Sequence, residues 1–340
     1  MVVTPTARRD RPEWFNEFLA DRGATKPSRH TLDAYCRDFD GIAAIIVGGP
    51  EVAAMRLEDI TRDSLRTAFS IFAASHAAAS ARRCWSTWNT VCTYLYSSEL
   101  IPGNPMSMVG RAKAQKSLPK ALPPNAIDAI LADLAHAQTQ PQRRDNWVNR
   151  DRALVLTALL AGLRLDELVG MNVSDVHLVG DGGVLHVRGK GEKDRRVPIE
   201  APLIGVIEDY LEDRSIRFPG RRRRHSPGGG LAAWPRGAPL FVSAKDETRI
   251  TRSTVQYRVL RLFRRAGVST EAGALVHGLR HTFATDLANA NVSVYELKNL
   301  LGHESLATSQ RYVDGAGRET RAAAARNPLY DRLNDDPSRT

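Results

Sequence analysis

The chain has 340 residues, of which 42% are hydrophobic and 25% charged, and it carries a formal net charge of +10. This length predicts two domains that each bury a core, and the charge favours a polyanionic partner, either nucleic acid or an acidic membrane surface. The first residues, MVVTPTARRDRPEWF, lack the apolar segment of a signal peptide. The longest apolar run, ALVLTALLAGL, is too short to span a bilayer. The three cysteines form no CxxC pair. We therefore expect a cytoplasmic protein with no membrane span and no metal site built on cysteine.

The first hundred residues have the apolar spacing of helices. Four successive segments each place large apolar residues on one helical face, the first two around Phe15, Phe18, Phe39 and Ile42. Thr61 is a predicted N-cap for the third helix. The fourth, from about 77 to 98, carries Arg82 and Arg83 near its start. This pattern predicts a helical domain over residues 8–106.

Residues 107–124 form a predicted interdomain linker, because they combine basic side chains with prolines and little periodicity. Two functions stay open for the linker: a solvated tether, or a segment that lies along a phosphate backbone. Its basic residues are Arg111, Lys113, Lys116 and Lys120.

The second domain is predicted over 125–314, mainly helical with one small β-hairpin. Residues 151–170 are expected to be helical, and 184–188 and 195–199 have strand composition around a Gly-Lys-Gly connection. The stretch RRRRHSPGGG is too rich in glycine and like charge to pack, so it is either a solvated loop or a DNA contact. Helices are expected again up to Tyr312, and residues 315–340 form a tail.

One predicted helix, VHGLRHTFATDL at 276–287, concentrates cationic and titratable side chains. His277 and His281 are four positions apart, a spacing that can chelate zinc. However, a HExxH site needs glutamate directly after the first histidine, where this chain has Gly278, and no cysteine or carboxylate cluster supplies further ligands. The sequence therefore predicts no metal here.

A phosphate site explains these residues better. Transfer of a phosphodiester needs cations around the non-bridging oxygens, and the planar guanidinium of arginine matches two oxygens at once. Arg164 in AGLRLDEL and Arg280 in HGLRHTFA both follow Gly-Leu on apolar helical faces. The structural alternative is an internal salt bridge, for instance between Arg164 and Glu167. Downstream, NLLGHESLATSQRYVD adds His303 and Tyr312, a hydroxyl nucleophile that can form a reversible phosphodiester.

Five motifs occur in an order that resembles the tyrosine recombinase (phage integrase) family. They are GLRLDEL, VRGKGEKDRRVPI, HGLRHTFATDLA, LLGHES and QRYVD. The resemblance covers 125–314, and the helical first domain is similar in kind to the family's core-DNA-binding (SAM-like) domain. The implied fold is therefore mainly α, with a mixed α/β catalytic domain after a helical DNA-binding domain.

The resemblance implies a site-specific recombinase or integrase that works through a 3′-phosphotyrosine. Arg164 and Arg280 would grip the scissile phosphate, His303 would donate a further hydrogen bond, and Tyr312 would attack phosphorus. Glu167 would orient the arginine pocket rather than react.

The resemblance also assigns the proton-transfer residues. Lys190 would protonate the departing 5′ oxygen, with Lys193 as its competitor, and His277 would act in proton transfer or positioning near the nucleophile. His281 is then expected to be of secondary importance. No ATP, metal or other cofactor is expected, because the covalent link retains the energy of the phosphodiester.

The expected partners are double-stranded DNA recombination sites, on which four protomers would exchange strands through a Holliday junction. A directionality factor is a further expected partner, the tail 315–340 would pack on a neighbouring protomer or fold back, and the location would be the nucleoid. Two alternatives remain: nicking and resealing like a type IB topoisomerase, and a DNA-binding regulator without catalysis. The predicted DNA-contacting residues are Arg82, Arg83, Arg111, Lys113, Lys116 and Lys193.

Overall fold

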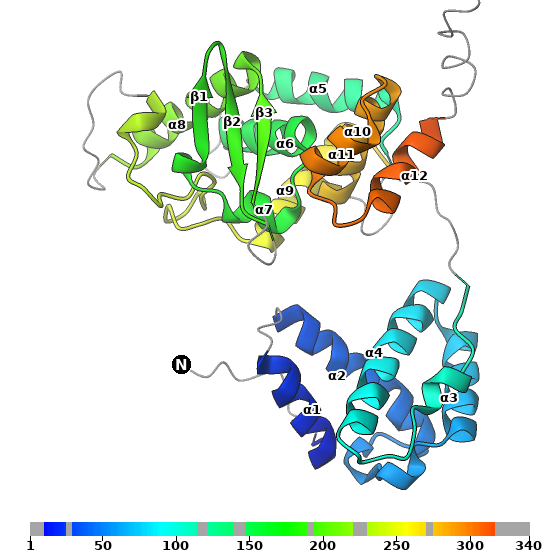
Figure 1. Cartoon of the computed structure of the whole chain (residues 1–340). Helices are drawn as coiled ribbons and strands as arrows, with labels where there is room; N and C mark the ends of the chain where they lie inside the picture. The colour runs from blue at the N-terminus through cyan, green and yellow to red at the C-terminus, as the bar shows by residue number, and fades with distance from the viewer. Residues whose placement is uncertain are drawn as a thin grey trace, which may run out of the picture. The chain divides into compact units, whose positions relative to one another are not determined.

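The protein is described here as a computed structural model over residues 10–24, 29–113, 121–138, 147–189, 194–219, 230–269 and 275–316. The chain divides into two compact units, Met1–Lys116 and Ser117–Thr340, each with its own hydrophobic core (Figure 1). Lys116, Lys190 and Lys193 lie outside the described residues, as do positions 220–229 and the tail from 317 onward.

The first unit is helical, as its apolar spacing predicts. Its main helices are α1 (Glu13–Ala24), α2 (Arg29–Ile46), α3 (Arg62–Ser75) and α4 (Ala78–Ser97). Short 3₁₀ turns lie at η1 (Val52–Ala54), η2 (Leu57–Asp59) and η3 (Pro105–Met108).

Aromatic side chains hold the first unit together. The rings of Phe15 and Phe39 stack with centroids 3.9 Å apart, and Phe39 stacks on Trp88 at 5.4 Å. All three side chains are fully buried. Thr61 caps α3, because its side chain accepts a hydrogen bond from the backbone N–H of Ser64. The predicted N-cap is therefore confirmed.

The second unit is mainly helical around a small sheet. Its first helices are α5 (Pro124–Gln138), α6 (Val148–Ala161) and α7 (Leu165–Gly170), followed by η4 (Val173–Asp175). The strands are β1 (Val176–Val179), β2 (Gly182–Val187) and β3 (Arg195–Ile199). The later elements are α8 (Ala201–Arg217), η5 (Gly230–Ala233), α9 (Arg252–Arg265), α10 (Leu275–Asn289), α11 (Val294–Leu301) and α12 (Leu306–Ala316).

The strands form an antiparallel sheet in the order β1-β2-β3, with Leu185 opposite Val197 and Val187 opposite Arg195. The predicted hairpin is confirmed, but the sequence did not predict β1. Only the first residue of β1, Val176, is buried, so the strand lacks the apolar alternation that marks a strand in sequence.

The helices α6, α10, α11 and α12 pack beside one another in the second unit. The buried helix α6 contributes Leu154, Val155 and Ala158 to the main core. A smaller cluster joins α10, α11 and α12, which lie together in Figure 1, and it includes Ala284 and Leu297. Within the described ranges, none of the helices combines the length and apolarity needed to cross a bilayer.

Candidate active site

The site begins where the predicted helix 151–170 is interrupted. α6 ends at Ala161, and Gly162 adopts the left-handed conformation with φ 59°. The chain then turns through Leu163 and Arg164 into α7. Glycine tolerates this conformation because it has no Cβ. The expectation of uninterrupted helix was therefore wrong, and the interruption is what carries Arg164 to the site.

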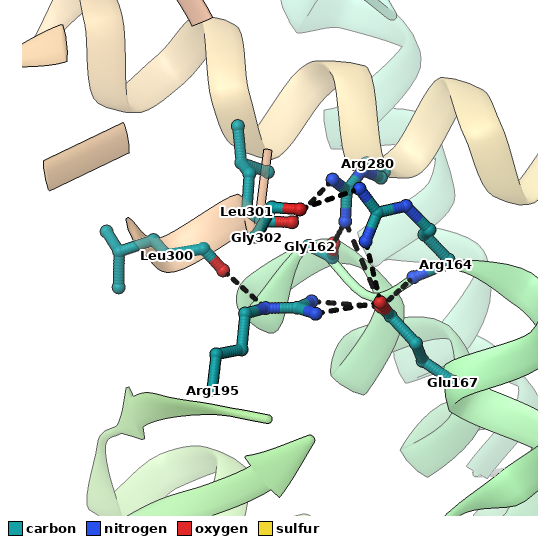
Figure 2. Close-up of polar contacts among 8 residues, drawn as sticks. All are labelled: Gly162, Arg164, Glu167, Arg195, Arg280, Leu300, Leu301 and Gly302. Carbon is teal, nitrogen blue, oxygen red and sulfur yellow. Dashed lines mark hydrogen bonds and ion pairs between the residues drawn. The ribbon is translucent and has the colours of Figure 1, made fainter. Parts of the chain in front are cut away.

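Glu167 is the centre of an arginine cluster. Its carboxylate accepts hydrogen bonds from the backbone N–H of Arg164 at 2.7 Å and from Arg164 Nη1 at 2.8 Å. It also accepts two from Arg195, whose Nη1 and Nη2 lie 2.7 and 2.9 Å from Oε1 and Oε2 (Figure 2). Burial by itself raises the pKa of this carboxyl, but the hydrogen bonds and charges of the two arginines outweigh burial and lower it to about 2. Glu167 is therefore ionised at neutral pH.

Arg280 enters the same cluster from α10. Its side chain is 4% exposed, its Nη1 donates to the carbonyl of Gly162 at 2.6 Å, and its Nη2 donates to that of Leu301 at 2.7 Å. Burial first, and then the neighbouring Arg164, lower the pKa of Arg280 to about 10. Arg280 thus keeps its positive charge at neutral pH.

The C-terminal end of α11 gathers three guanidinium groups. The carbonyls of Leu300, Leu301 and Gly302 accept hydrogen bonds from Arg195, Arg280 and Arg164 respectively (Figure 2). These carbonyls have no partner within the helix and lie at the negative end of its dipole, so cations are stabilised there. The end of α11 therefore positions all three arginines relative to His303, the next residue along the chain.

Gly162→Ala is expected to destabilise this unit strongly. A Cβ at this position would lie 2.3 Å from Cδ1 of Phe283, and the positive φ would strain any L side chain. Strain of about 1–2 kcal/mol and overpacking of about 1–3 kcal/mol give an expected loss of about 2–5 kcal/mol in the free energy of unfolding. Gly180→Ala is the matched control, because Gly180 has φ 57° but no atom within 4 Å of its Cβ position. Chemical denaturation of both variants measures the difference, and equal losses would contradict the clash.

Tyr312 lies on α12, 5% exposed, and its hydroxyl is 2.7 Å from Nδ1 of His281 on α10. Its ring is nearly parallel to that of His303, with centroids 6.2 Å apart. Nδ1 of His303 is hydrogen-bonded to the buried hydroxyl of Ser309 at 2.8 Å. His277 is exposed, and its ring lies 5.1 Å from that of His281. The three histidines and the tyrosine thus form a contiguous group.

The electrostatics of this group keep its members neutral. Burial first raises the pKa of Tyr312 above its ordinary value, although Arg280, Arg311 and Arg164 oppose that shift. Burial followed by nearby cations lowers the pKa of His281 and that of His303 to about 4. Partial desolvation, then Arg280 and Arg164, also lower the pKa of His277. At neutral pH a protonated phenol therefore faces neutral imidazoles.

The three arginines predicted to contact DNA in the first unit have partners within the protein. Arg82 donates to a backbone carbonyl at 2.7 Å, Arg83 pairs at 2.6 Å with the buried carboxylate of Asp38, and Arg111 donates to a serine hydroxyl at 3.1 Å. Lys113 is exposed. Each arginine therefore helps to hold its own unit together, and the DNA contacts of these residues stay predictions.

Sequence reasoning missed Arg195 and gave His281 only secondary importance. Arg195 shares one face of β3 with the buried Val197 and Ile199, and this period of two was visible in the sequence. An arginine on a core-facing strand position requires an anionic partner, which is Glu167. His281 follows Arg280 directly and shares its helical face with the buried Ala284 and Ala288. That spacing places it against a neighbouring helix, but the sequence could not say which one.

The structure shows the ion pair of the first interpretation of Arg164, and it leaves part of that side chain exposed, as the second interpretation requires. Arg164 does form the internal ion pair with Glu167, yet its side chain is 39% exposed while Glu167 is 5% exposed. An arginine that is anchored on one side and open on the other can also bind an anion. In the described part of the chain, no three His, Cys, Asp or Glu side chains cluster as metal ligands would.

Comparison with known proteins identifies the family. The phage integrase family matches residues 122–318, which are more than half of the chain and contain every side chain of the arginine cluster as well as Tyr312. The chain belongs to the phage integrase family. This integrase-family protein is 28% identical over 302 residues to the tyrosine recombinase XerC of Myxococcus xanthus, covering 88% of this chain and 91% of that protein.

Solved structures share the fold of this integrase-family chain. The XerH site-specific recombinase in its post-cleavage complex with palindromic difH substrate has a TM-score of 0.64 at 20% identity, covering 79% of this chain and 73% of XerH. A lambda integrase tetramer bound to a Holliday junction has a TM-score of 0.62 at 21% identity, covering 90% of this chain and 78% of that one. The predicted family and fold class are confirmed. The protein is a tyrosine recombinase that acts on DNA by cleaving and rejoining it.

Proposed function

We propose that Tyr312 is the nucleophile and that Arg164 and Arg280 hold the scissile phosphodiester during its attack. The phenol oxygen bonds to phosphorus, the bond to the 5′ oxygen breaks, and a 3′-phosphotyrosine and a free 5′-hydroxyl result. The observation that carries this proposal is the arginine cluster. Arg164, at the N-cap of α7, and Arg280, on α10, share Glu167 and the end of α11. The next helix, α12, carries Tyr312.

The cluster has the properties that phosphoryl transfer requires. Negative charge on the non-bridging oxygens is stabilised by cations that are already in position before the reaction. Arg280 is fixed by two carbonyls, and Arg164 combines an anchored Nη1 with an exposed side chain. Glu167 orients the pair, and its own negative charge is matched by Arg195. A phosphodiester bound there would gain Arg164 and Arg280 as guanidinium partners.

The remaining roles follow the order of the motifs. His303, held by Ser309, donates a further hydrogen bond to the phosphate. His277 acts in proton transfer or positioning. Lys190 is the general acid that protonates the 5′ oxygen, and Lys193, its competitor, contacts DNA. Because the covalent intermediate retains the energy of the phosphodiester, rejoining needs no ATP, metal or other cofactor.

The assembly that fits this chemistry is a homotetramer on two double-stranded DNA sites. Strands would be exchanged in two pairs through a Holliday junction, and a lambda integrase tetramer of the same fold is bound to such a junction. Residues 8–106 and 125–314 would contact DNA as separate domains, joined by the linker 107–124. The tail 315–340 would pack on a neighbouring protomer, a directionality factor would regulate the outcome, and the protein would be located at the nucleoid.

Recovery of the covalent intermediate tests the proposal. The protein is incubated with fragmented genomic DNA of its source. The reaction is stopped with detergent, and the DNA ends that are bound to protein are sequenced. After nuclease and protease digestion, mass spectrometry is expected to find the residual nucleotide on the peptide that contains Tyr312. A nucleotide on any other residue, or no adduct at all, would overturn the nucleophile assignment.

The same experiment separates recombination from simple nicking and resealing. A recombinase is expected to give adducts at a small set of recurrent sites. Adducts spread evenly over the genome, together with relaxation of supercoiled plasmid that lacks those sites, would instead indicate an activity like that of a type IB topoisomerase.

A further inference from the structure

The hydrogen bond between Tyr312 and His281 is the one polar contact that the phenol hydroxyl makes among the described residues. The hydroxyl oxygen and Nδ1 are 2.7 Å apart, and the two rings are tilted by 43° with centroids 5.6 Å apart. This contact joins α10 to α12, which also share the apolar cluster that contains Ala284, Ala288 and Val313. The two side chains are therefore held together by packing as well as by the hydrogen bond.

The other two histidines of the site are differently placed. His303 faces the ring of Tyr312 rather than its hydroxyl, and its Nδ1 is bonded to Ser309. His277 is next to His281 and is exposed. Among the described histidines, His281 is thus the one whose ring nitrogen reaches the atom that must lose a proton.

We infer that His281 is the general base of the cleavage step. Its Nδ1 accepts the phenolic proton of Tyr312 while the phenol oxygen bonds to phosphorus, and the departing 5′ oxygen takes its proton from the general acid of the proposed mechanism. On rejoining, the imidazolium returns the proton to the tyrosine oxygen as the phosphotyrosine bond breaks. This inference depends on the proposed function of Tyr312, because only a nucleophilic tyrosine needs a proton acceptor.

The surroundings of His281 explain why this proton transfer would require bound DNA. Burial first, and after it the neighbouring His277 and Arg280, lower the pKa of His281 and make the free imidazole a weak base. A phosphodiester bound by Arg164 and Arg280 brings a negative charge close to the same group. That charge opposes the arginines and raises the basicity of His281. Deprotonation of the nucleophile is thereby linked to occupancy of the site.

The test uses two substitutions that remove different properties. The substrate is a nicked duplex built on a cleavage site mapped with the wild-type protein, and adduct formation is followed in a single turnover. His281→Ala removes the hydrogen bond and the base, whereas His281→Asn keeps a polar atom near the position of Nδ1 but cannot accept a proton at neutral pH. Both variants are expected to cleave about 100- to 10,000-fold more slowly than the wild type.

Recovery of the wild-type rate by His281→Asn would show that the hydrogen bond merely positions Tyr312, and this would overturn the inference. A His281→Ala variant as fast as or faster than the wild type would overturn it as well, because His281 would then only restrain the tyrosine. His177→Asn is the matched control, because His177 is exposed on β1. It is expected to cleave at the wild-type rate.

A second reaction shows whether the arginine pocket survives the substitution. DNA that ends in a 3′-p-nitrophenyl phosphate is joined to a strand with a free 5′-hydroxyl, and p-nitrophenolate leaves without needing a proton. Tyr312→Phe and the double variant Tyr312→Phe/His281→Asn are expected to join these strands at equal rates. Slower joining by the double variant would mean that His281 supports the pocket structurally, which also overturns the inference. By contrast, failure of the wild type to form an adduct on Tyr312 would overturn the proposed function itself.

Discussion

Tyr312→Phe is expected to abolish covalent capture of DNA while DNA binding is retained. Phenylalanine keeps the ring with which α12 takes part in the apolar cluster of α10, α11 and α12, and it removes only the hydroxyl. The loss of one hydrogen bond to His281 changes the free energy of unfolding by about 1 kcal/mol. Cleavage has no other route once the attacking oxygen is absent. The measurement is adduct formation on the mapped site after denaturation, alongside a gel-shift titration of binding.

The matched control for this substitution is Tyr295→Phe. Tyr295 lies on α11 in the same unit and its side chain is 69% exposed. The control is expected to form the adduct at the wild-type rate. A denaturation-resistant adduct in Tyr312→Phe would show that another side chain attacks phosphorus, and loss of binding would show that the substitution damages more than the chemistry.

Arg195→Ala is expected to have the largest effect on stability. It removes two hydrogen bonds from a carboxylate that is 5% exposed and one from the carbonyl of Leu300. Removing one partner of a buried ion pair typically costs about 3–5 kcal/mol. Glu167 would keep only its contacts with Arg164 and the more distant Arg280. Hydrogen exchange with mass spectrometry measures the loss of amide protection in α7 and α11 separately from that in the first unit.

Arg196→Ala is the control for Arg195→Ala, since it removes the same charge from the next residue of β3, whose side chain is exposed. Its expected effect is within about 0.5 kcal/mol. Arg195→Lys keeps the charge but cannot match both carboxylate oxygens, so it should recover only part of the lost stability. Equal protection of α7 and α11 in both alanine variants would contradict the central position of Arg195 in the cluster.

The prediction of the fold succeeded where the signal was local. The capping of α3 by Thr61 depends on residues within one turn. In the hairpin strands β2 and β3, buried side chains alternate with more accessible ones. β1 escaped prediction because it is short and two of its three apolar side chains face solvent, Leu178 being 57% exposed and Val179 60%. The interruption of the helix at Gly162 was not predicted either. The carbonyl of Gly162 accepts a hydrogen bond from Arg280, which is 118 residues away in the sequence.

By itself, the sequence determined the helical periodicities, the hairpin and the order of the motifs that carry arginine, histidine and tyrosine. Only the tertiary structure decided which charges meet. It joined Arg195 to Glu167 across 28 residues and Arg164 to Gly302 across 138, and it brought His281 rather than His277 to the hydroxyl of Tyr312. The physical reason is that caps and periodicity depend on neighbours a few residues away. The partner of a buried charge, by contrast, depends on which elements pack against it.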